Sequence, residues 1–506
     1  MGARTRPGVL TSLRAQGMGG SEDSERRGEQ PRGGDDGGTP HAAKGWRTAA
    51  LLLVVILACV TSVAGYRHLR AGASGASGRW SAGGALGRSP QPQSPAGPKR
   101  QDPYEIQDPT ATGARFNIVS ERRAGGDGLS ERQAREMARL EALGYASGST
   151  EGRGRSGVTI HDRALSQAGP NLYIDGHAPS AYLMDMQGKV LHRWHHSFEQ
   201  AFPGRKLPKN TVDTGFYRRV HLFDDGALLA IFEGQGMIKL DRDSKLLWAY
   251  PARTHHDVQV MDDGTIYVLT RRSEMARRIS PERPILHDAI DVLRPDGKRI
   301  RRVSILGAIE RSRFANVLPR VHHGGDIFHT NTLKILDGRH AHRLPAFAKG
   351  NALISILMLN MIAVVDMKRG EVVWAMSDGW HHQHEPVLLD SGNMLLFDNG
   401  RERFSRVVEF DPVTQQTLWQ YGGRGIDFYS RTCGTAQRLS NGNTLITETD
   451  QGRAFEVTRD SKIVWEFHTP QRAGDDANLI ASLFQVQRLP ADFPIGWARA
   501  PGDEAP

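Results

Sequence analysis

The stretch Ala436-Gln437-Arg438-Leu439-Ser440-Asn441-Gly442-Asn443 decides the fold, because variants of it recur along the chain. Each copy ends an apolar run, turns at a Gly and begins a new apolar run, which is the pattern of a β-hairpin. The other copies are Phe223-Asp224-Asp225-Gly226, Met261-Asp262-Asp263-Gly264, Leu336-Asp337-Gly338 and Asp390-Ser391-Gly392-Asn393. A sixth copy is missing before Asn171, where it is expected, but Val486-Gln487-Arg488-Leu489-Pro490 resembles its first half.

A second hairpin unit alternates with the first. It consists of an apolar pair, a polar turn and an apolar stretch that usually ends in Trp. Its copies occupy 183–194, 238–248, 291–305 (without Trp), 364–374, 408–419 and 455–465. Two hairpins per repeat give four strands per repeat, as in a propeller blade. We therefore predict an all-β, six-bladed β-propeller over 157–498, in which the C-terminal strand completes the first blade and leaves no open edge.

Composition excludes several other classes of protein. The chain has 506 residues, too many for one small core, and its 24% charged residues exclude a polytopic membrane protein. Of its two cysteines, Cys59 lies in an apolar run, so Cys433 has no partner for an intrachain disulfide. The net charge is +9, but the basic residues are dispersed and no nucleic-acid-binding module is recognisable. No nucleic-acid partner is expected.

The segments before the propeller differ in composition. Residues 1–45 lack Phe, Trp and Tyr and are predicted to be a disordered tail. Residues 46–66 contain an uncharged apolar run and are predicted to be a transmembrane signal anchor. This makes the chain a single-pass membrane protein with the propeller on the extracytoplasmic side: periplasmic, lumenal or extracellular. A cleaved signal peptide is the alternative, because Ser62-Val63-Ala64 resembles a cleavage site.

Two further segments lead into the propeller. Residues 67–128 are biased toward Gly, Ser, Ala, Pro and Arg and are predicted to be a flexible stalk. Residues 129–156 are predicted to form a short helix and a linker. Ser130 and Gln133 have the spacing of a capping box, and Gly144 is placed to end the helix.

Candidate site residues follow from the blade period. Counting back eight residues from Gly264 and Gly392 reaches His256 and His384, and nine from Gly338 reaches His329. The same count from the other turns, together with the closing strand, gives Arg218, Gly434 and Phe484. A lone His usually satisfies a local hydrogen bond, but three His at equivalent positions predict a site at one mouth of the central channel.

The stretches that carry these histidines resemble arylsulfate sulfotransferases. They are His255-His256-Asp257-Val258, 326–332, 383–389, 396–400, 405–410 and 436–445, and together they span roughly residues 168–492. The resemblance implies a six-bladed propeller that moves a sulfuryl group from a phenolic sulfate ester to a phenol acceptor without a cofactor.

The resemblance also assigns roles to residues. The nucleophile falls on His384, which would be transiently sulfated, and His329 and His256 are its catalytic partners. Arg218, Asn331 and His255 are candidate substrate-binding residues. His255, His381 and His382 are adjacent to the counted histidines and are expected in supporting or solvated positions. For His255 this is an alternative to substrate binding.

One position departs from the family pattern. Where the family usually has Arg, the matching position of this chain is Leu357, in the stretch Ile354-Ser355-Ile356-Leu357-Met358. An apolar side chain cannot balance the charge of a sulfuryl group, so Arg218 is the candidate substitute.

Two other functions remain open from the residues. The three histidines could hold a catalytic metal, although their spacing is not diagnostic and no metal is expected. The propeller could instead be non-catalytic and bind an anionic ligand or a protein partner through its channel. No Gly-x-x-x-x-Gly-Lys loop and no Gly-x-Ser-x-Gly elbow occurs, which disfavours a nucleotide-sulfate donor and a serine hydrolase.

Overall fold

The computed structural model describes residues 130–141, 149–152, 154–207, 214–321, 323–377, 379–473 and 478–500. The predicted tail (1–45), anchor (46–66) and stalk (67–128) lie outside the described residues. Within the described ranges, no helix is both long enough and apolar enough to cross a membrane.

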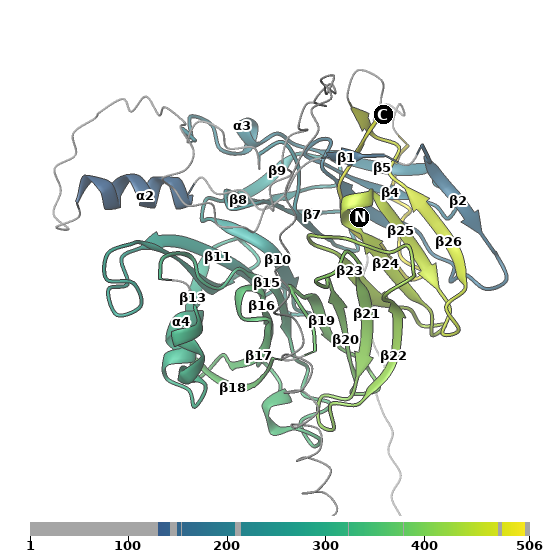
Figure 1. The fold of residues 1–506 in the computed structure, drawn as a ribbon. Helices are drawn as coiled ribbons and strands as arrows, with labels where there is room; N and C mark the ends of the chain where they lie inside the picture. The colour runs from purple at the N-terminus through teal and green to yellow at the C-terminus, as the bar shows by residue number, and fades with distance from the viewer. Residues whose placement is uncertain are drawn as a thin grey trace, which may run out of the picture. The chain divides into compact units, whose positions relative to one another are not determined.

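Six antiparallel sheets of four core strands form the propeller (Figure 1), which confirms the predicted all-β, six-bladed architecture. The first blade contains β29 (Leu483–Arg488), β3 (Asn171–Asp175), β4 (Ser180–Met184) and β5 (Val190–His195). The second contains β6 (Arg219–Leu222), β7 (Leu228–Phe232), β8 (Gly236–Leu240) and β9 (Leu246–Tyr250). The third contains β10 (Thr254–Val260), β11 (Ile266–Glu274), β12 (Ile285–Leu293) and β13 (Arg299–Ser304), with β14 (Gly325–Asp326) parallel to β12.

The other three blades have the same topology. The fourth contains β15 (Thr330–Ile335), β16 (Ala352–Ile356), β17 (Met361–Asp366) and β18 (Glu371–Met376). The fifth contains β19 (His384–Leu388), β20 (Met394–Asp398), β21 (Arg406–Phe410) and β22 (Thr417–Gly422). The sixth contains β23 (Thr435–Arg438), β24 (Thr444–Glu448), β25 (Arg453–Val457) and β26 (Ile463–His468).

The first strand of each blade contacts the first strand of the next, from β6 through β10, β15, β19 and β23 to β29. The Gln485 side chain on β29 closes the circle, because it accepts a hydrogen bond from Val220 N (3.1 Å) and donates one to Val220 O (3.2 Å). Positions that begin these six strands therefore surround one axis, although they are far apart in sequence.

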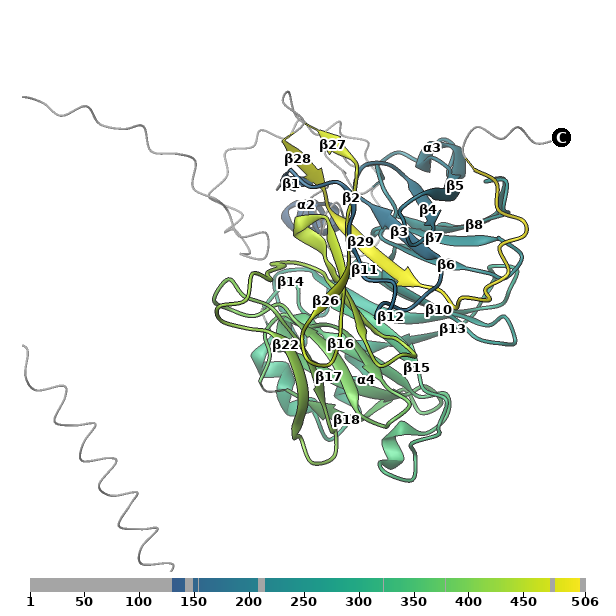
Figure 2. The same cartoon turned by 90° about the vertical axis from the view of Figure 1, so that its right-hand side faces the viewer.

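The propeller closes as the sequence predicted, and the structure shows one additional strand. β29 pairs with β3, with Arg488 opposite Asn171, so the last strand completes the first blade as predicted. Figure 2 shows yellow β29 beside blue β3. In addition, β2 (Gly157–His161) pairs with β26 and becomes a fifth strand of the last blade, which the sequence pattern did not indicate.

The recurring sequence features explain how the blades hold together. In the Asp-Asp-Gly turn, Gly264 has φ 78°, and Asp263 Oδ1 accepts a hydrogen bond from Thr265 N at 2.9 Å. The Trp residues that end the second units bridge to the neighbouring blade: Trp194 Nε1 donates to Gly226 O (2.9 Å) and Trp465 Nε1 to Met186 O (3.0 Å). Buried apolar residues form one cluster at each blade-to-blade interface, so the core consists of layers between packed sheets.

The remaining elements lie outside the blades. α2 (Glu131–Glu141) begins with the predicted capping box, because Gln133 N donates to Ser130 Oγ and Ser130 N to Gln133 Oε1. It contacts the third blade through Arg283 and Glu136 (2.8 Å). The short helices are α3 (Phe198–Ala201), α4 (Ile305–Glu310), η1 (Ala315–Arg320), η2 (Pro345–Phe347), η3 (Leu357–Leu359) and η4 (Thr449–Gln451). β1 (Ser149–Glu151), β27 (Arg472–Ala473) and β28 (Leu479–Ala481) form a small separate sheet.

Candidate active site

The five positions counted from the turn glycines, and Phe484 in the closing strand, lie where the six innermost strands begin. Arg218, His329 and Gly434 immediately precede β6, β15 and β23, and His384 is the first residue of β19. His256 and Phe484 lie near the starts of β10 and β29. The blade period therefore located equivalent places in all six blades.

The side chains at these positions converge. The ring centroids of His256 and His329 are 4.9 Å apart. Arg218 Nη2 is 3.4 Å from Cys433 Sγ, and Arg218 Cζ lies 5.5 Å from the centroid of Phe484. Arg218 and the three histidines are each at most 3% exposed. The channel thus encloses three imidazoles and one guanidinium in a buried polar centre.

His384 is held in one tautomer by its neighbours. Its Nδ1 lies 2.8 Å from Asn399 Oδ1 and 3.0 Å from His382 O, and both of these atoms are acceptors. The Asn399 amide is itself oriented, because Nδ2 donates to Ser430 O (2.8 Å) and Cys433 O (2.7 Å). Nδ1 of His384 must therefore carry the proton, which leaves the lone pair on Nε2.

The electrostatic environment keeps His384 neutral. Burial, together with the positive charge of Arg218, lowers its pKa to about 3, although the hydrogen bond that Nδ1 donates to Asn399 Oδ1 opposes the shift. Nε2 is buried and makes no hydrogen bond with the described residues. A neutral imidazole with an available, desolvated lone pair is the form of histidine that acts as a nucleophile.

His329 is supported by a carboxylate. Its Nδ1 lies 2.8 Å from Asp326 Oδ2, and its backbone N donates to Asp326 Oδ1 (2.9 Å). A carboxylate at Nδ1 fixes the ring orientation and stabilises the positive charge that the ring acquires whenever Nε2 binds a proton. This is the arrangement of a histidine that exchanges a proton through Nε2.

His256 belongs to a chain of buried polar groups. Its Nδ1 lies 2.9 Å from His255 Nδ1 and 3.6 Å from Glu233 Oε1. His255 lies behind His256, with its Nε2 3.7 Å from Asp288 Oδ1. Burial lowers the pKa of both imidazoles well below the usual value, so both are neutral.

Two guanidinium groups flank the carboxylate of Glu233. Arg218 Nε and Arg271 Nη1 are each 3.9 Å from it. Of the described residues, Glu233, His255 and His256 bring three possible metal-ligand atoms within 4.8 Å of one another. This differs from the predicted set of three channel histidines, and the two guanidiniums oppose a cation at that carboxylate. The donor set does not fit a metal ion.

The other candidate substrate-binding residues occupy supporting places. Asn331 is buried and its Nδ2 donates to Gln383 O (2.9 Å), which links β15 to the residue before His384. His255 contacts His256 and Asp288, as described above. Both side chains thus brace the centre, whereas Arg218 borders it directly.

Leu357 lies beside the centre. It is fully buried at the start of η3, and its N–H points to His329 O at 3.4 Å. Its side chain brings no charge to this side of His329. The nearby positive charges belong to Arg218 and Arg271, on the second and third blades.

The backbone is strained where the centre is built. His256, His329, Glu385 and Cys433 have φ between 50° and 54°, a left-handed conformation that is rare for residues with a side chain. The ladders of β10, β15 and β19 are each interrupted near these residues. Such strain is common at functional sites, where the surrounding structure must maintain it.

Several residues of the centre were not predicted from the sequence. Asp326 and Asn399 lie inside stretches that resemble the family, so the signal for them was present although no role was assigned. Glu233 and Arg271 follow no periodic count and lie outside those stretches. Only their approach in space identifies them.

A comparison with protein families completes the description of the centre. Residues 219–470 match the model of a family described as arylsulfotransferase (ASST). The propeller is arylsulfotransferase-like. The matched range contains His256, His329 and His384, whereas Arg218 and the closing strand β29 lie outside it.

A comparison with curated proteins found no match. Among solved structures, the arylsulfotransferase-like propeller is similar to a protein of unknown function from Bacteroides caccae, with 11% identity and a TM-score of 0.40. That match covers 60% of this chain and 94% of that one. Virginiamycin B lyase from Staphylococcus aureus has 9% identity and a TM-score of 0.32, covering 54% of this chain and 83% of that one.

Proposed function

We propose that the propeller transfers a sulfuryl group from an aryl sulfate ester to a phenol through a sulfohistidine on Nε2 of His384. The observation that carries this proposal is the tautomer of His384. Asn399 and His382 hold the proton on Nδ1, and burial and Arg218 keep the ring neutral. The lone pair of Nε2 is then available without prior proton transfer.

In the first half-reaction, the lone pair of Nε2 forms a bond to sulfur while the bond between sulfur and the phenolic oxygen breaks. The oxygen leaves with the electron pair and takes a proton from His329, whose other nitrogen is bound to Asp326. Asn399 Oδ1 and His382 O stabilise the Nδ1–H of the resulting sulfo-imidazolium.

In the second half-reaction, the acceptor phenol attacks sulfur and gives its proton to His329, and the bond between Nε2 and sulfur breaks. The chain returns to its starting state without a cofactor. Arg218 and Arg271 supply positive charge for the sulfuryl oxygens. They replace the family arginine, whose position is occupied by Leu357 in this chain. His256 borders the same space and completes the set of donors.

The test is incubation of the purified protein with 4-nitrophenyl sulfate, with and without a phenol acceptor. We expect continuous nitrophenol release with the acceptor. Without it we expect a single burst, and a mass increase of one sulfuryl group on His384. The variant His384→Ala should show neither, whereas His342→Ala, at an exposed histidine, should behave as the wild type. Continuous turnover by His384→Ala would refute the proposal.

A second candidate function is supported by Leu357. An apolar side chain at this position suits a propeller that binds an anionic ligand through its channel without catalysis. In that case the wild-type protein would bind 4-nitrobenzenesulfonate, which has no transferable group, but would release no phenol from the sulfate ester.

We also propose that residues 46–66 anchor the chain in a membrane, with the propeller on the extracytoplasmic side. The uncharged run within this range supports the proposal. Deletion of these residues should move the protein from the membrane fraction to the soluble fraction. Unchanged fractionation would refute it.

A further inference from the structure

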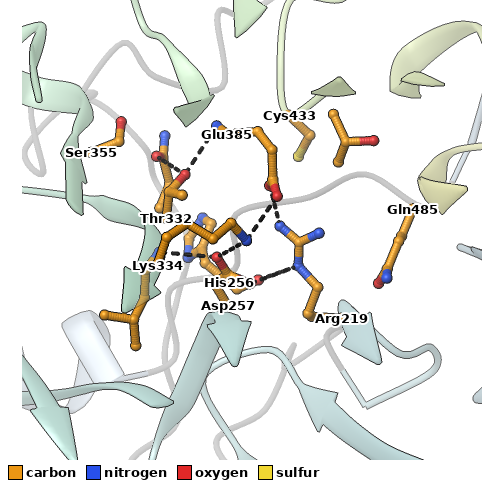
Figure 3. Close-up of polar contacts among 12 residues, drawn as sticks. Arg219, His256, Asp257, Thr332, Lys334, Ser355, Glu385, Cys433 and Gln485 are labelled. Carbon is orange, nitrogen blue, oxygen red and sulfur yellow. Dashed lines mark hydrogen bonds and ion pairs between the residues drawn. The ribbon is translucent and has the colours of Figure 1, made fainter. Parts of the chain in front are cut away.

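Beside His256, four charged side chains from four consecutive blades form a closed cluster (Figure 3). Asp257 binds Arg219 Nε (3.2 Å) and Lys334 Nζ (2.9 Å). Glu385 binds the same two cations, at 2.5 Å and 2.9 Å. Each cation therefore contacts both carboxylates, and the four-charge cluster of Arg219, Asp257, Lys334 and Glu385 has no net charge.

Arg219, Lys334 and Glu385 keep their charges although they are largely buried. Burial disfavours each charge, but Asp257 and Glu385 outweigh it and raise the pKa of Arg219 and of Lys334. The same two cations lower the pKa of Glu385 against burial. The Asp257 side chain is 1% exposed, and that of Lys334, the most accessible, 24%.

Sequence adjacency connects the cluster to the active centre. Arg219, Asp257 and Glu385 directly follow Arg218, His256 and His384. In each pair, one side chain belongs to the centre and the next to the cluster. Displacing a cluster residue therefore displaces the backbone of its catalytic neighbour.

Hydrogen bonds strengthen this connection. Arg219 Nε donates to the carbonyl of His256 (3.2 Å), and Glu385 N donates to Thr332 Oγ1 (3.0 Å). His256 and Glu385 both have left-handed backbones, which must be held by contacts elsewhere. Arg219 of the cluster supplies such a contact to His256, and Thr332, two residues before Lys334, supplies one to Glu385.

We propose that the four-charge cluster is a positioning platform: its residues hold His256, His384 and Arg218 in register and keep the floor of the site electrically neutral toward an anionic aryl sulfate. This inference rests on the proposed function, because it concerns the same site. It assigns positioning roles to Arg219, Asp257, Lys334 and Glu385, none of which was a predicted site residue.

The neutrality of the cluster predicts the direction in which each variant changes the affinity for an anion. Glu385→Gln leaves one uncompensated positive charge below the site, and Lys334→Met leaves one negative charge. At a separation of about 10 Å and an intermediate dielectric constant, one charge changes the affinity for an anion by about tenfold. We expect the Kd of 4-nitrobenzenesulfonate to fall about tenfold in Glu385→Gln and to rise about tenfold in Lys334→Met.

The double variant Lys334→Met/Glu385→Gln restores neutrality through the remaining pair of Arg219 and Asp257. We expect its Kd to return to within about threefold of the wild-type value. Its kcat should stay reduced, because Glu385 no longer braces His384. This split between binding and turnover separates positioning from a general loss of stability.

A control is Glu456→Gln, which removes one carboxylate from a fully buried ion pair with Arg488, at the place where the last strand closes the first blade. It should lower stability while leaving Kd unchanged. Calorimetric titration measures the Kd of the sulfonate and does not require turnover. Absence of turnover in the wild type would therefore refute the proposed function but not the proposed role of the cluster.

Kd shifts of the same sign in both single variants would overturn the platform, as would no shift in either variant or no sulfonate binding by the wild type. If Glu385→Gln does not fold, Lys334→Met and the double variant still provide the comparison. In that comparison, a Kd raised equally in Lys334→Met and in the double variant would refute the proposal.

Discussion

The channel and the closure seam are two buried polar regions that use their charges differently. In the seam, between β29, β3 and β25, Arg488 Nη1 binds Glu456 Oε2 (2.9 Å) and Arg488 Nε donates to Asn171 Oδ1 (2.6 Å). In the channel, Nε2 of His384 is buried without a hydrogen bond to the described residues, and its pKa is lowered to about 3.

The difference shows what separates a structural polar cluster from a candidate active site. Arg488 holds strands together by an ion pair whose geometry is already complete. His384 is oriented just as firmly on its Nδ1 side, but its second nitrogen, Nε2, makes no hydrogen bond with the described residues. Burial alone does not identify the site; an oriented atom kept available for a substrate does.

The largest expected effect is on stability and belongs to the seam. Glu456→Gln leaves Arg488 buried without its counter-ion, which should cost about 3–5 kcal/mol of unfolding free energy. Denaturant titration measures this loss, and turnover per folded molecule should not change. Loss of turnover in the folded fraction would contradict the proposal that the seam is structural and the channel catalytic.

Arg218→Met makes the corresponding change in the channel. It removes the guanidinium whose charge acts on His384 and should lower turnover by about a hundredfold to a thousandfold. The pKa of His384 should rise, because a positive charge that opposes protonation is gone. Arg488→Met is the control, and equal turnover losses in the two variants would contradict the assignment of Arg218.

Asn399→Leu tests control of the His384 tautomer. The variant removes one of the two acceptors at Nδ1 and leaves only His382 O, so it should reduce kcat by about tenfold to a hundredfold, as for other residues that orient a functional imidazole. Asn399→Asp keeps an acceptor there and should retain more activity than Asn399→Leu. The reverse order of kcat would show that the tautomer is not what Asn399 provides.

The smallest effect is the pH dependence of stability. Between pH 6.5 and about 3, unfolded His384 binds a proton that the folded protein excludes, so stability falls with decreasing pH in this window. Each such histidine contributes up to about 1.4 kcal/mol per pH unit. Thermal melts at pH 7 and pH 5 should show a smaller loss for His384→Ala than for the wild type.

Asp288 has the opposite effect on the pH dependence of stability: it stabilises the folded state as the pH falls. Burial and the neighbouring charge of Asp326 raise its pKa to about 7, so between pH 3.8 and 7 the folded state binds the extra proton. His255, Arg271 and Thr330 also face this carboxyl. Asp288→Asn should therefore steepen the acid loss of stability, and a shallower slope would contradict this sign.

Much of the centre could be predicted because propeller repeats place equivalent positions around one axis. The turn glycines located His256, His329 and His384 by counting alone. Glu233 and Arg271 escaped the count, because side chains that reach in from neighbouring segments leave no periodic signal. The cluster residues were hidden for another reason: in sequence, a charge next to a histidine resembles an ordinary surface residue.

The order of residues by itself determined that this chain forms six blades closed by its last strand, since hairpin turns and alternating apolar runs are local properties. It also determined which side chains begin the inner strands. Only the tertiary structure decided the tautomer of His384, the pairing of four buried charges and the approach of two arginines to Glu233. These depend on distances between blades, and electrostatic and hydrogen-bond energies are set by distance and burial rather than by position along the chain.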